Sequence, residues 1–94
     1  MATFDEWLDA YDVVYEALPA QSDHACPNCG HRTLRMVFNA RPGADVGYVS
    51  FWCDTCLEGI SVSRAPIPAG ATVRSTDKPV EERRPAIPNY RLAT

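Results

Sequence analysis

The sequence has no long apolar run. No stretch approaches the roughly 20 consecutive apolar residues that a membrane-spanning helix needs. The first residues, 1–6, also lack the basic start and the apolar core of a secretory signal. We therefore expect a cytoplasmic protein, whose thiols stay reduced and free to bind a metal. Disulfides formed after export by an unrecognised route remain the alternative.

Patterns typical of stand-alone enzymes are also missing. There is no glycine-rich phosphate loop, and no serine lies in a nucleophile-elbow context. Residues 1–25 contain no Lys or Arg and carry six acids, whereas residues 26–94 carry nine basic residues and six acids. An acidic head before a mildly basic body argues against a general polyanion binder.

Four cysteines are present, in two Cys-x-x-Cys pairs, Cys26 with Cys29 and Cys53 with Cys56. Each pair places two sulfurs on one tight turn, and two such turns supply the four thiolates that tetrahedral Zn²⁺ prefers. A chain of 94 residues is short enough to need such a staple. Structural zinc contributes about 10–16 kcal/mol in small peptides. We therefore expect one structural Zn²⁺ and unfolding of the cysteine region without it.

The N-terminal segment has apolar residues at steps of three and four, which predicts an amphipathic helix over 3–18. Thr3 and Glu6 fit a capping box at its start, and Pro19 is expected to end it. Its apolar stripe includes the aromatic residues Trp7, Tyr11 and Tyr15. They either pack on the chain's own sheet or form a docking surface for a partner or a second copy.

Three segments show the alternation or turn boundaries of strands, at 33–39, 46–52 and 60–64. The loop 41–45 contains Pro42 and Gly43 and has the composition of a turn. The simplest closure is a three-stranded antiparallel sheet clipped by the two cysteine turns. With the helix, this predicts a small α+β fold.

Cys26-Pro27-Asn28-Cys29-Gly30 and Cys53-Asp54-Thr55-Cys56, with hairpin strands between them, resemble the zinc ribbon superfamily. The resemblance covers about residues 24–64 and implies Cys26, Cys29, Cys53 and Cys56 as ligands. With the helix before it and the proline-rich segment after it, we expect three parts: a helix at 1–20, a ribbon at 21–65 and a tail at 66–94. Zinc ribbons occur chiefly as binding modules in transcription factors, polymerase subunits, ribosomal and replication proteins.

The first cysteine turn also resembles a rubredoxin knuckle, which would make the protein an iron-bound electron carrier. Rubredoxins carry the proline and glycine in their second pair, where this chain has Asp54 and Leu57. His24 and His31 flank the first pair, but four cysteines already complete the coordination. A closed Cys₄ site leaves the metal no open position for catalysis. The paired acids of ribbon-type transcript-cleavage factors are absent from the 41–45 tip. We expect no enzyme activity.

Basic residues of the ribbon raise the alternative of nucleic-acid binding in transcription or its regulation. They could share a surface with aromatic residues of the second strand. The candidates are Arg32, Arg35, Arg41 and Arg64. The acidic helix would oppose this contact.

The tail contains five prolines from position 66 onward, and its apolar residues are isolated. This pattern predicts an extended or disordered segment that forms no core of its own. Its end, 85–92, could be a linear motif around Tyr90 that orders on a partner. We expect a non-catalytic adaptor or accessory subunit that makes protein contacts through the helix and the tail.

Overall fold

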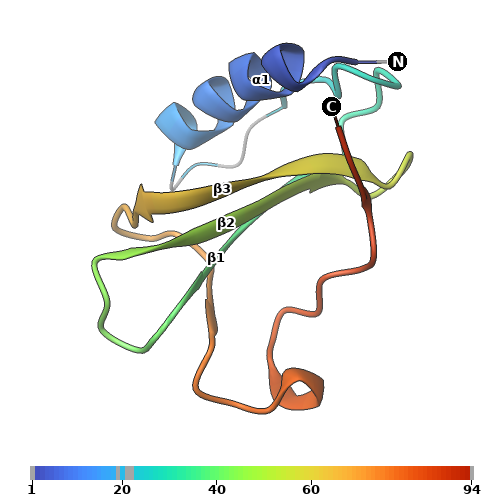
Figure 1. Ribbon diagram of the computed structural model, residues 1–94. Helices are drawn as coiled ribbons and strands as arrows, with labels where there is room; N and C mark the ends of the chain where they lie inside the picture. Colours follow the sequence, from blue (N-terminus) through green and yellow to red (C-terminus); the bar gives the residue numbers. More distant parts are fainter. Residues whose placement is uncertain (1, 19, 21–22, 94) are drawn as a thin grey trace.

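The computed structural model describes residues 2–18, 20 and 23–93. The described chain is a small α+β fold in which the helix, the sheet and the C-terminal segment form three layers (Figure 1). The elements are α1 (Phe4–Ala17), β1 (Leu34–Ala40), β2 (Val46–Cys53), β3 (Glu58–Pro66), β4 (Val73–Ser75), the 3₁₀ helix η1 (Val80–Glu82) and β5 (Arg91–Leu92).

The start of α1 is the predicted capping box. The Thr3 hydroxyl accepts a hydrogen bond from the Glu6 backbone N–H at 3.2 Å, and the Glu6 carboxylate accepts one from the Thr3 N–H at 3.1 Å. These bonds satisfy two of the backbone donors that a helix start leaves unpaired. The helix is one residue shorter at each end than predicted because Thr3 and Leu18 are its caps. The predicted stop at Pro19 lies outside the described residues.

The sheet is larger than the sequence predicts. Strands β1, β2 and β3 form the expected antiparallel meander, but the sheet has five strands in the order β4-β1-β2-β3-β5. The two added strands come from the tail and pair parallel to β1 and β3. The prediction of a three-stranded antiparallel sheet is therefore wrong in extent. Neither added strand contains proline, so each can pair at an edge although the tail is proline-rich.

The core lies between α1 and one face of the sheet. Trp7 is fully buried, and its ring meets that of Phe51 edge-on at 5.6 Å. Tyr11 also packs edge-on against Phe51, at 6.0 Å. Phe38, Val49 and Ile60 complete the buried sheet face. The helix thus covers its own sheet.

The opposite sheet face is crossed by residues 76–90, which we call the strap (Figure 1). Tyr90 stacks on Trp52 with ring centroids 5.6 Å apart, and its hydroxyl donates to the Ile60 carbonyl at 3.1 Å. Arg83 braces the strap through bonds to the carbonyls of Lys78 and Thr76. The expectation of a disordered or merely extended tail is not confirmed, because apolar side chains on this second face give the tail a surface to cover.

Candidate metal centre

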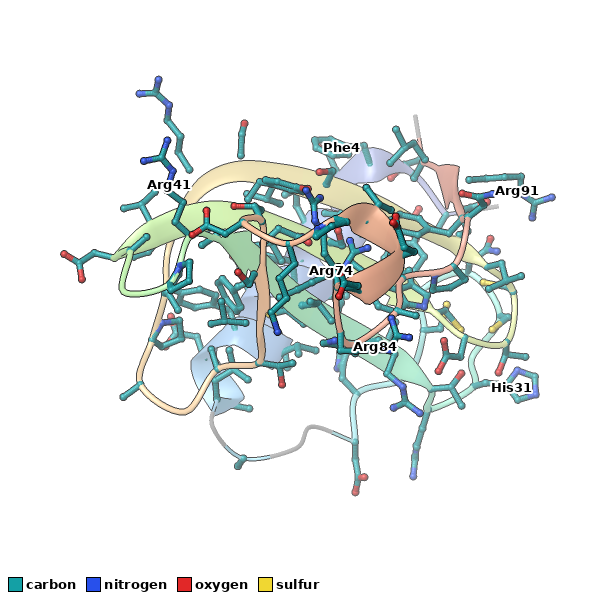
Figure 2. All side chains as sticks on the ribbon, turned by 90° about the horizontal axis from the view of Figure 1, so that it is seen from below. Phe4, His31, Arg41, Arg74, Arg84 and Arg91 are labelled. Carbon is teal, nitrogen blue, oxygen red and sulfur yellow. The ribbon has the colours of Figure 1, made fainter. Side chains whose placement is uncertain are left out.

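The two cysteine turns meet at one end of the sheet. Cys26 and Cys29 lie in the turn before β1, Cys53 ends β2, and Cys56 lies just before β3. The four sulfurs lie within 4.8 Å of one another, with Cys26–Cys56 at 3.8 Å and Cys29–Cys53 at 3.6 Å. A tetrahedral ion with metal–sulfur bonds of about 2.3 Å requires sulfurs about 3.8 Å apart. The four cysteines therefore fit a single tetrahedral metal ion. Figure 2 shows their sulfurs at the same end of the molecule as His31.

The two turns share one backbone design. The N–H of Gly30 donates to the Cys26 carbonyl, and the N–H of Leu57 donates to the Cys53 carbonyl, both at 2.9 Å. Gly30 has a φ of 79° and Leu57 a φ of 53°, so both occupy the left-handed region that favours glycine. Leu57 therefore takes the position in the second turn that Gly30 takes in the first.

Gly59 has a different purpose within β3. A Cβ atom there would collide with the Phe51 carbonyl oxygen and lie 2.7 Å from the Trp52 Cα. Glycine is therefore required at this position, where the backbone of β3 lies very close beside that of β2 directly after the second cysteine turn.

Hydrogen bonds and burial act on the thiols. The Asn28 N–H donates to the Cys26 sulfur at 3.3 Å, but burial dominates and raises the pKa of Cys26 to about 12. Burial also acts on Cys53, yet the Thr33 hydroxyl, 3.3 Å from its sulfur, and backbone N–H groups outweigh it and lower the pKa of Cys53 to about 6. Because a metal binds thiolates, metal binding must displace protons and weakens as pH falls.

The helix start is tied to both cysteine turns. The Ala2 N–H donates to the Asn28 side-chain oxygen at 3.0 Å in the first turn. The Trp7 indole N–H donates at 3.3 Å to the carboxylate of Glu58, which is 2% exposed and lies two residues after Cys56. Sequence reasoning missed both contacts, because nothing distinguishes Asn28 or Glu58 from ordinary polar residues before the chain is folded.

The two histidines lie near the first turn but outside the candidate ligand group. His31 contributes its backbone carbonyl, which accepts from the Cys26 N–H at 2.8 Å. Its exposed imidazole follows the turn. This placement agrees with a site built from four thiolates.

The aromatic residues predicted for partner binding lie inside the molecule rather than on a free surface. The side chains of Trp7 and Tyr11 are buried between α1 and the sheet. Tyr15 is half-buried, and its hydroxyl donates to the Pro66 carbonyl at 2.7 Å. The structure thus favours the alternative in which the helix packs on its own sheet. Tyr90, the last residue of the strap, is stacked on Trp52 of the sheet.

The arginines predicted for nucleic-acid binding are all exposed but are not gathered on one aromatic face. Arg35 on β1 forms an ion pair with Asp54 at 2.8 Å, and Arg64 lies on β3. Figure 2 places Arg41, in the loop after β1, at the opposite end from His31. Phe51 and Trp52 are buried, and Tyr48 is 43% exposed. The arrangement lacks the interleaved basic and aromatic surface of single-strand binders.

No protein-family model, no curated protein and no solved structure matches this chain in comparisons with known proteins. Among the described residues, α1 is too short and too polar to cross a bilayer. Functional inference therefore rests on the chain's own geometry.

Proposed function

We propose that this protein is a non-catalytic interaction module in which a structural Zn²⁺ on the four cysteines fixes a ribbon-like sheet for contacts with another protein. The tetrahedral spacing of the four sulfurs is the observation that carries the proposal. Four thiolates close the coordination sphere, so the ion has no position left for water or substrate. Its role is then to hold the two turns together.

Zinc is proposed over iron because the second cysteine turn lacks the proline and glycine that mark rubredoxin, carrying Asp54 and Leu57 instead. Elemental analysis and an absorption spectrum of gently purified protein test this choice. We expect one zinc per chain and no visible absorption. A coloured protein containing one iron per chain would refute the zinc assignment and indicate an electron-transfer protein instead.

A protein partner is favoured over nucleic acid by the way charge is separated. The acids of residues 1–25 lie on or next to α1, whereas every basic residue belongs to the sheet, its loops or the strap. A phosphate backbone would meet scattered arginines on one side and acids on the other.

Affinity capture of the full chain from its native host, with and without nuclease, tests the assignment. We expect a defined protein to be retained equally in both arms and to dissociate when the metal is removed with a chelator. Retention of nucleic acid alone, lost in moderate salt, would instead establish a nucleic-acid-binding ribbon.

A further inference from the structure

A groove of about 380 Å³ lies between the strap and the second face of the sheet. This volume is at the small end of the range for ligand sites, about 300–1,000 Å³. Arg35, Met36 and Trp52 line it from the sheet, Asp54 from the second cysteine turn, and Pro85 and Ala86 from the strap. The strap lies on the side of the sheet away from α1 (Figure 1), and none of the four cysteines lines the groove that it helps to form.

One wall of the groove is an uncovered strand edge. Strand β1 begins at Leu34, but β4 pairs only with its residues 38–40. The Phe38 N–H donates to the Thr72 carbonyl, so the backbone of Phe38 points away from β2. Backbone groups of alternate residues point to the same side of a strand, so the N–H and C=O of Met36 point there too. Within the described chain, the pairing of β4 ends before it reaches them.

The strap cannot close this edge itself. Pro85 and Pro88 both line the groove opposite β1. Proline has no backbone N–H and is poorly suited to pair within a sheet. The strap therefore forms an apolar wall while the hydrogen-bonding groups of β1 stay available.

Two arginines lie in or beside the groove, against one carboxylate: Arg35 and Asp54 line it, and Arg84 directly precedes the lining residue Pro85. Asp54 accepts from the Arg35 Nε through one oxygen and from the Trp52 indole N–H through the other, both at 2.8 Å. This ion pair offsets the charge of Arg35, but the guanidinium keeps two further nitrogens that can donate hydrogen bonds. Arg84, directly before Pro85, is exposed and donates to the backbone carbonyls of Glu81 and Arg83. A carboxylate is the ligand group that these guanidinium ions favour.

We propose that this groove binds an extended acidic segment of a partner protein, which adds as a short strand along residues 34–37 of β1. The inference rests on the proposed function and names the surface through which the module acts. Four residues at about 3.3 Å each give a contact about 13 Å long. Main-chain hydrogen bonds to Met36 supply affinity, and a carboxylate on Arg35 supplies specificity.

A second copy of this chain fits the groove less well than a loose segment does. Pro85, Ala86 and Pro88 of the strap line the same groove as residues 35–37 of β1, so the strap stands beside this edge and obstructs the edge-to-edge approach of two folded sheets. An extended peptide can enter because it needs only the width of a single strand. The occupant is therefore a flexible segment of a different protein.

Selection of random 12-residue peptides displayed on phage, against the zinc-loaded full chain, tests the proposal. We expect the enriched peptides to combine β-forming residues with at least one Asp or Glu and no proline in the bound stretch. A synthetic copy of the best peptide should shift the NMR amide signals of Arg35, Met36 and Ala86. If no peptides are enriched, or if the NMR shifts are confined to α1, the proposal that the groove binds a peptide is refuted.

Matched variants then separate the groove from the rest of the surface. Ala86→Trp should fill the groove and weaken binding of the selected peptide about tenfold or more, whereas Ala44→Trp in the exposed 41–45 loop should not. Arg35→Glu should weaken binding about tenfold, and Arg41→Glu, which changes the charge equally at the distant loop, less than about twofold. Thermal melts of all four proteins verify that each remains folded.

The same variants distinguish failure of the groove from failure of the proposed function. If a captured partner protein binds the Ala86→Trp and Arg35→Glu variants as tightly as the wild type, the groove is not its binding site. The proposed function as an interaction module would still hold. Absence of any protein partner would overturn the proposed function. A concentration-dependent dimer that Ala86→Trp abolishes would replace the partner segment with a second copy.

Discussion

Replacing Trp7 with alanine tests whether α1 is part of the core or a docking helix. The indole is fully buried, meets Phe51 edge-on at 5.6 Å and donates a hydrogen bond to Glu58 at 3.3 Å. If α1 were a docking helix, the loss of Trp7 would weaken partner binding and leave the fold intact. The observed packing leads to the opposite expectation.

The size of the effect follows from these contacts. A buried tryptophan removes about 200 Å² from water, which at about 25 cal/mol per Å² corresponds to about 5 kcal/mol. Measured losses for comparable truncations are about 3–5 kcal/mol. Trp7→Ala also leaves the buried carboxylate of Glu58 without its donor, which adds about 1–3 kcal/mol. The total approaches the whole stability of a small domain, about 5–15 kcal/mol.

Urea unfolding followed by circular dichroism, with zinc present throughout, measures this loss. Phe4→Ala is the matched control because Phe4 lies on the same helix but is 38% exposed, and it should cost far less. Trp7→Phe keeps part of the ring and should fall between the two. If the Trp7→Ala variant unfolds at the same urea concentration as the wild type, Trp7 does not stabilise the core and α1 is better interpreted as a docking helix.

Three further predictions concern the metal, two glycines and a tyrosine. Cys26→Ser should abolish stoichiometric zinc by elemental analysis and lower the melting temperature, since zinc contributes about 10–16 kcal/mol in comparable sites; an unchanged melt would contradict a structural metal. Gly59→Ala should destabilise by about 3 kcal/mol because its Cβ has no room, whereas Gly30→Ala, which has room but a φ of 79°, should cost about 1–2 kcal/mol in urea unfolding; equal effects would refute the distinction. Burial raises the pKa of Tyr11 to about 12, so the folded state holds a proton that the unfolded chain releases near pH 10, and stability should fall between about pH 10 and 12. Tyr11→Phe should flatten that loss in alkaline thermal melts, and an identical pH dependence would argue against it.

Local signals account for the parts of the fold that sequence reasoning anticipated. The helix boundary rests on Thr3 and Glu6, three residues apart, and the capping box forms without any help from distant residues. The first strand shows alternation in its own residues. The candidate ligands also come as adjacent pairs, so each turn presents two sulfurs wherever the rest of the chain lies. Only the meeting of the two turns requires the sheet.

The parts that were missed depend on distant contacts. Strand β4 has three residues and β5 has two, too few for any periodic pattern, and each pairs parallel to a strand far away in the sequence. Tyr90 reads as an isolated aromatic residue until Trp52 is placed beneath it. Leu57 gives no sign of a left-handed backbone, because glycine two positions later is the more obvious choice.

The strap changes what the metal has to accomplish. A ribbon alone would expose one sheet face and depend on zinc for most of its stability, but here α1 covers one face and the strap covers part of the other. A metal on the four cysteines would instead secure the end of the sheet where the helix begins, since the Ala2–Asn28 and Trp7–Glu58 hydrogen bonds tie the helix to this end. Metal loss should therefore loosen the cysteine turns and the first turn of α1 before it reaches the pairing of β1 with β4. Residues 34–37 of β1 lie between these regions, so a bound metal would hold one end of this strand edge while the pairing with β4 holds the other.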